Sequence, residues 1–171
     1  MAASAFRVGD KIIHPAHGAG VVTDIKLLGF FGLKTKPYYS IELLGEPGTV
    51  VMVPIRDAGK VGLRHPISRS QLTRVWRRLR AEPNTLPSDH KERYSLVRTR
   101  IEEGDVLEIA AVLRDLWWKD SHIRKLTMEG KRLYAKGMRL LASEVAIIQG
   151  SEMAEAEAQI SEMLDEQAKE E

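Results

Sequence analysis

The spacing of apolar residues changes character once along the chain, close to residue 62. Before that point, apolar and polar positions alternate in short runs rich in Val, Ile and Tyr, which is typical of β-strands. We expect strands at 11–13, 21–25, 38–43 and 49–53, with the glycines of 18–20 bending the chain before the second strand. Short strands separated by glycine turns predict a small, curled half-barrel of the SH3 or Tudor type.

Beyond residue 62, apolar residues recur every three or four positions, which predicts helices. Ser68 or Ser70 can cap the first helix, Asp105 a later one, and Thr127 the longest, because their side-chain oxygens can accept from free backbone N–H groups. The expected helices start at the serines and then cover about 89–103, the segment after Asp105, 128–149 and 152–167. We therefore predict an α+β protein of two domains: the β half-barrel over 1–62 and an all-α helical bundle over 63–171.

Composition places the chain among ordinary soluble proteins, with 43% hydrophobic and 29% charged residues. No apolar run is long enough to cross a bilayer, and the N-terminus shows no signal-peptide pattern. The absence of cysteine excludes disulfides and thiolate chemistry. We expect a cytoplasmic protein without a membrane partner.

The net charge of +2 conceals a strong asymmetry. Residues 64–139 contain 18 Lys and Arg against 10 Asp and Glu, whereas residues 150–171 contain eight acids and one lysine. A basic middle favours a polyanionic partner, although the same residues could simply solvate helix faces.

Catalytic and metal-binding patterns are weak. His14 and His17 lack a third nearby ligand, so we expect no metal site and no cofactor. Glu102, Glu103 and Asp115 are expected on exposed helix faces rather than in a cleft. The sequence therefore does not indicate an enzyme.

The order and spacing of several short motifs resemble the CarD/CdnL family of bacterial transcription regulators. The β part also resembles the RNA-polymerase-interacting domain of transcription-repair coupling factors. The motifs in the β part are Val8-Gly9-Asp10-Lys11-Ile12, His14-Pro15-Ala16-His17-Gly18, Tyr39-Ser40-Ile41, Val51-Met52-Val53-Pro54 and Val61-Gly62-Leu63-Arg64. The helical motifs are Arg93-Tyr94, Gly104-Asp105, Leu113-Arg114-Asp115-Leu116-Trp117 and Leu140-Leu141-Ala142-Ser143-Glu144-Val145-Ala146.

The resemblance implies that the β module pairs edge to edge with a strand of the RNA polymerase β subunit. The loop 28–31 lacks a basic residue that some relatives carry there, and is expected to form an apolar rim instead. Ile41 and Met52 could alternatively fill the core of the module. The positions that match the family's polymerase contact are Ile41, Thr49, Val50, Val51, Met52 and Pro54.

The resemblance also implies that the helical domain holds promoter DNA at the upstream edge of the transcription bubble, through phosphates and the minor groove. Many relatives insert a tryptophan wedge, and His90 occupies that position here; it could also be a solvent-exposed histidine beside the linker. Trp118 could pack on a neighbouring helix or replace the wedge. The expected DNA-binding residues are His90, Lys91, Arg93, Lys119, Lys131 and Arg132.

The implied function is a monomeric, non-enzymatic regulator that reaches the nucleoid through RNA polymerase and stabilises the open complex without reading sequence. One alternative is a polymerase-binding adaptor whose helical domain, through its acidic last helix, recruits another protein rather than DNA. A weaker alternative is an SH3-like peptide binder unrelated to polymerase.

Overall fold

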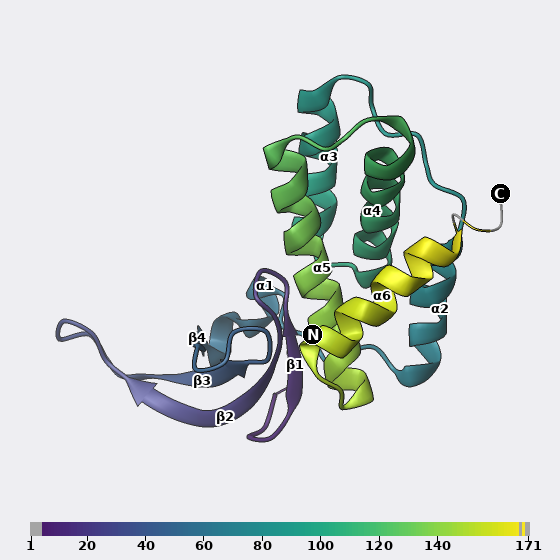
Figure 1. The fold of residues 1–171 in the computed structure, drawn as a ribbon. Coiled ribbons are helices and arrows are strands. Elements are labelled where there is room, and N and C mark those ends of the chain that lie inside the picture. The colour runs from purple at the N-terminus through teal and green to yellow at the C-terminus, as the bar shows by residue number, and fades with distance from the viewer. Residues whose placement is uncertain (1–4, 168, 170–171) are drawn as a thin grey trace. The chain divides into compact units, whose positions relative to one another are not determined.

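The computed structural model describes residues 5–167 and 169, which form two compact units divided between Pro66 and Ile67 (Figure 1). The β unit thus includes a few residues beyond Gly62, because Leu63 packs in its core and Arg64 pairs with Ile13. The predicted α+β class, with a small β module followed by helices, is confirmed. None of the helices in the described part of the chain is long and apolar enough to cross a membrane.

The β unit is an antiparallel sheet in which each strand pairs with the next along the chain. The glycines of 18–20 open the second strand, so the predicted bend before Val21 is wrong. A Cβ on Gly20 would lie 2.7 Å from the Glu42 carbonyl oxygen, and glycine therefore lets the second and third strands approach closely. The strands are β1 (Lys11–His14), β2 (Gly18–Leu28), β3 (Lys36–Leu43) and β4 (Val50–Pro54).

Two features curl this sheet. The register between β2 and β3 shifts between Val22 and Asp24, and such a bulge increases local twist. After β4, the short helices η1 (Ile55–Asp57) and α1 (Ala58–Val61) turn the chain back. The backbone of Arg64 then exchanges hydrogen bonds with Ile13 of β1, at 2.8 and 3.2 Å.

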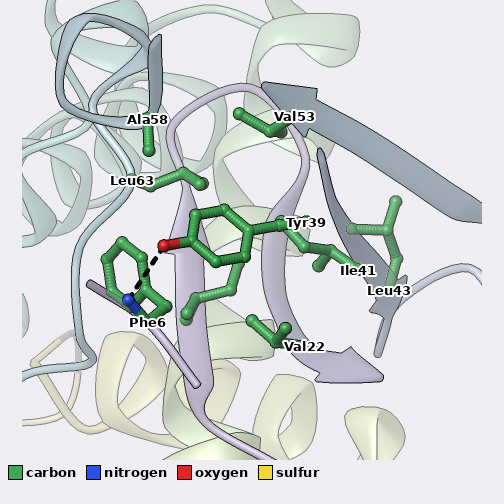
Figure 2. Close-up of a cluster of buried hydrophobic side chains, with 9 residues drawn as sticks. Phe6, Val22, Tyr39, Ile41, Leu43, Val53, Ala58 and Leu63 are labelled. Carbon is green, nitrogen blue, oxygen red and sulfur yellow. Dashed lines mark hydrogen bonds between the residues drawn. The ribbon is translucent and has the colours of Figure 1, made fainter. Parts of the chain in front are cut away.

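The core of the β unit gathers around Tyr39 (Figure 2). The Tyr39 hydroxyl accepts a 3.0 Å hydrogen bond from the Phe6 N–H, and the two rings meet edge to face at 5.7 Å. This contact fastens the segment before β1 to the third strand. The buried members are Phe6, Ile12, Val22, Tyr39, Ile41, Leu43, Val53, Ala58 and Leu63.

Four helices of the second unit begin at side-chain caps. Ser68 forms a capping box with Gln71, and Asp89, Asp105 and Thr127 each accept from backbone N–H groups one turn ahead. The helices are α2 (Arg69–Arg80), α3 (His90–Glu103), α4 (Val106–Trp118), the π-helical turn η2 (Lys119–Ile123), α5 (Met128–Gln149) and α6 (Met153–Gln167).

A buried ion pair joins three parts of the helical unit. Arg114 of α4 donates to the Asp115 carboxylate at 2.7 and 2.8 Å and to the Arg78 carbonyl oxygen of α2 at 3.1 Å. The same carboxylate accepts the Asn84 N–H of the linker at 2.9 Å. Asp115 is 2% exposed, so its predicted position on an exposed helix face is wrong, and its charge serves internal structure.

Candidate functional site

Strand β4 is an edge of the sheet, with β3 on one side of it. The Leu43 N–H donates to the Thr49 carbonyl oxygen, which makes Leu43 and Thr49 a hydrogen-bonded pair. In an antiparallel pair, hydrogen-bonded and non-hydrogen-bonded positions alternate. The Thr49 N–H itself donates to Glu46 in the turn, at 2.9 Å. The register then directs the backbone groups of Val51 and Val53 toward β3, and those of Val50 and Met52 away from it.

This outer edge offers a partner strand a short series of backbone hydrogen-bonding groups. Val50 and Met52 each present one N–H and one carbonyl oxygen, while Pro54 has no N–H and ends the donor series. The Val50 side chain is 50% exposed, Thr49 is exposed, and Met52 and Pro54 are partly buried. No described strand pairs with this outer edge, and a strand edge of this kind is a template for an added strand.

Two residues of the predicted polymerase contact face inward. Ile41 is fully buried in the β core, and Val51 packs partly against that core. Ile41 therefore belongs to the core and not to a contact surface. The residues left at the surface for a partner are Thr49, Val50, Met52 and Pro54.

The β2–β3 hairpin continues beyond the last residues paired with β4, as a two-stranded arm (Figure 1). Leu27, Phe31 and Leu33 on this arm are exposed, which agrees with the expected apolar rim. The Phe30 ring meets Tyr38 edge to face at 6.4 Å, and Tyr38 lies opposite Pro54 in the sheet. The apolar arm is therefore continuous with the end of the β4 edge.

The basic residues predicted to bind DNA come together at one end of the helical unit. Helix α3 begins at this end, α4 finishes there and α5 begins there (Figure 1). His90 and Lys91 start α3, Lys119 follows α4, and Lys131 and Arg132 lie in the first two turns of α5. All are exposed except Lys119, which is half-buried. Residues far apart in sequence thus share one surface, which we call the basic end.

Side-chain contacts hold the starts of α3 and α5 together. The Thr127 hydroxyl, which caps α5, donates to the Tyr94 hydroxyl of α3 at 2.8 Å. Arg98 of α3 forms an ion pair with Glu129 of α5. These contacts fix the spacing between His90 and Lys131 on two different helices.

Arg93 differs from the rest of the predicted DNA-binding set because it is 8% exposed. Its Nη1 donates to the carbonyl oxygens of Pro87 and Ser88, at 2.9 and 3.1 Å. The guanidinium therefore holds the linker against the start of α3. This contact positions His90, which follows the linker directly.

Two carboxylates at the basic end are occupied by local hydrogen bonds. Asp89 accepts from the N–H groups of Glu92 and Lys91, and these bonds lower the pKa of its carboxyl. Asp120 accepts from the Leu126 N–H and from Lys125, which lowers its pKa as well. Both acids stay ionised and temper the positive charge of this surface.

Sequence reasoning omitted Arg124, an exposed cation in the turn between α4 and α5. Its place between Lys119 and Lys131 in the sequence is the signal that could have found it.

Trp118 is partly exposed, and its ring stacks on His122 with centroids 3.8 Å apart and an interplanar angle of 14°. That Trp118 takes the role of the family's wedge tryptophan stays a prediction.

His14 and His17 form a turn pair in the β unit, with ring centroids 4.7 Å apart. The His14 Nδ1 accepts the N–H groups of Ala16 and His17, at 3.0 and 3.3 Å. Burial, with the neighbouring His17 as a second cause, lowers the pKa of His14 below its usual value. A neutral His14 therefore stabilises the turn between β1 and β2.

Comparison with known proteins covers both units. Residues 6–67 match the family model of the CarD-like/TRCF RID domain, the RNA-polymerase-interacting domain, and residues 74–161 match the CarD C-terminal domain. A relative from Bacillus subtilis (strain 168), named "Putative transcription factor YdeB", is 26% identical over 145 residues, which cover 85% of this chain and 93% of the relative. The two matches follow one another in order, so the chain belongs to the CarD family of transcription factors, which regulate transcription in association with RNA polymerase.

Proposed function

We propose that this chain bridges the RNA polymerase β subunit and promoter DNA, with one unit for each partner. The β unit holds polymerase; it consists of residues 1–62 and the short following segment that completes its core. The helical unit holds DNA at the upstream edge of the bubble. The function is regulation of initiation by stabilisation of the open complex, without catalysis.

The observation that carries the polymerase half is the outer edge of β4. A β-strand of the partner can form backbone hydrogen bonds with Val50 and Met52 and extend the sheet. Met52 suits this contact, because its flexible thioether adapts to an imperfect partner surface. The exposed apolar arm lies next to the same edge and enlarges the available contact area.

The basic end supports the DNA half. Lysine and arginine side chains on three helices can contact successive phosphates, and such contacts are strong, salt-sensitive and independent of sequence. His90 takes the place of the family's wedge tryptophan, and an imidazole offers a smaller stacking surface than an indole. We expect phosphate contacts rather than the wedge to dominate in this chain.

Stabilisation of the open complex requires a contact that is stronger in the open than in the closed state. Each difference of about 1.4 kcal/mol between the two states changes their equilibrium tenfold. The exposed cations at the basic end can supply such a difference if the opened DNA approaches them more closely.

The test is the lifetime of promoter open complexes formed with the purified chain and RNA polymerase. A Lys131→Glu/Arg132→Glu variant should lose the increase in lifetime, and its binding to forked DNA should depend less on salt. Arg69→Glu/Arg74→Glu, in the first half of α2 and away from the basic end, reverses the same number of charges and is the matched control (Figure 1). If the double variant prolonged the open complex as the wild type does, the DNA half would be overturned and the adaptor alternative favoured.

A further inference from the structure

The helical unit contains a cavity of about 390 Å³ beside the linker before α3. This volume is within the range of roughly 300–1,000 Å³ that small-molecule sites occupy. Its walls are formed by residues 83–88 of the linker, by Arg93 and Asp115, and by Trp118, Lys119, Ile123 and Arg124.

The charge of this cavity is positive. Three of its described lining residues are cations: Arg93, Lys119 and Arg124. The Asp115 carboxylate is the opposing charge, but it is paired with the buried Arg114 and also accepts the Asn84 N–H. The three cations are therefore left to attract an anion.

Arg93 provides a preorganised positive charge in the wall. Its side chain is more than nine-tenths buried and is fixed by the carbonyl oxygens of Pro87 and Ser88. The same guanidinium lies over the Tyr94 ring, 5.1 Å from the ring centroid, which restrains it further. The wall therefore keeps a fixed positive charge when an anion enters the cavity.

The cavity also has an aromatic wall. Trp118 lines it, and His122 stacks on the indole within the π-helical turn, which holds the ring in place. Leu86 and Ile123 add apolar surface on neighbouring segments. A planar ring can stack on such a platform, and base–aromatic stacking is tolerant of base identity.

We propose that this cavity binds a nucleotide, with its base against Trp118 and its phosphate held by Arg93, Lys119 and Arg124. The combination of an aromatic wall with three cations matches a ligand that is planar at one end and anionic at the other. The nucleotide can be free, or it can be an unpaired residue of single-stranded DNA. Both present the same chemistry to the cavity, and neither needs the β unit or polymerase.

The test follows the Arg93 Nε–H and the Trp118 indole N–H by NMR, in the full chain titrated with adenosine monophosphate or with a short oligothymidine. Either probe should shift both signals, while the indole of Trp76 on α2 should stay in place. Adenosine alone and inorganic phosphate alone should bind at least about tenfold more weakly, because each supplies only one of the two contacts. Preference between the two probes identifies the source of the nucleotide.

Two variants and one control separate ligand contact from structure. Trp118→Leu should weaken nucleotide binding about tenfold or more, and Arg124→Gln should weaken it with no change in fold, because Arg124 is exposed. Lys125→Gln removes the neighbouring charge from a residue that does not line the cavity, and should bind as the wild type does. The proposal is overturned if neither probe shifts the two signals. Inorganic phosphate binding as tightly as the nucleotide, or Arg124→Gln behaving like Lys125→Gln, would overturn it too.

Discussion

The outward N–H of Val50 makes a direct test of strand addition possible. Replacing Val50 by proline removes that N–H and leaves the carbonyl oxygen and most of the side-chain volume in place. Proline is tolerated on edge strands where the missing donor faces outward. The β3–β4 ladder should survive, because its bonds come from Thr49, Val51 and Val53.

The expected effect follows from one lost hydrogen bond at a buried interface. The partner's carbonyl oxygen would be left unsatisfied, at a cost of about 1–3 kcal/mol. The dissociation constant for RNA polymerase should therefore rise roughly five- to 150-fold. The free energy of unfolding of the chain itself should change little, since no internal hydrogen bond is removed.

The assay is biolayer interferometry with immobilised core RNA polymerase, together with thermal unfolding followed by circular dichroism. Val50→Ala is the matched control, because it trims the side chain and keeps the N–H. Val51→Pro is the opposite control: it removes a donor that points toward Ile41 and should destabilise the sheet. If folded Val50→Pro bound polymerase within twofold of Val50→Ala, the edge-pairing argument would be refuted.

Three further predictions concern stability. In Gly130→Ala the new Cβ would lie 2.7 Å from the Tyr94 hydroxyl, so we expect a loss of about 1–3 kcal/mol; an unchanged denaturant midpoint would contradict this. Because the pKa of buried His14 lies below its usual value, its neutral form contributes stability that is complete above about pH 6.5 and is lost as the pH falls through the folded pKa. His14→Asn keeps an acceptor without the titration, so urea titrations between pH 7 and 5 should show a flatter profile than the wild type. Asp105→Ala removes the cap of α4 and should cost about 1 kcal/mol, visible as a fall of roughly 2–4 °C in Tm, whereas Asp105→Ser should restore most of it.

Local signals in the sequence predicted the helical elements well. Ser68, Asp105 and Thr127 cap the helices as expected, and Gly104 and Gly150 end α3 and α5 with positive φ angles. These features depend on residues within one turn of each other, so no tertiary information is needed to recognise them.

Positions that depend on distant neighbours were not predictable in the same way. Asp115 was expected on a surface, and it is buried because Arg114 and the Asn84 N–H satisfy it. Arg93 matched a DNA-binding position, yet it is buried and its Nη1 donates to two carbonyl oxygens of the linker. The glycines of 18–20 were expected to bend the chain, and they form the start of β2 because Gly20 faces the backbone of β3.

The sequence by itself determined the two-part organisation, the helix boundaries and the family, since each rests on local periodicity, capping and ordered motifs. Only the tertiary structure decided which backbone groups of β4 face outward, because strand register sets that direction. It also brought His90, Lys119 and Lys131 to one end of the helical unit, because α4 runs back alongside α3 and α5. The sequence shows how many charged residues each segment carries, but not which of them lie side by side. The packing of the helices decides that.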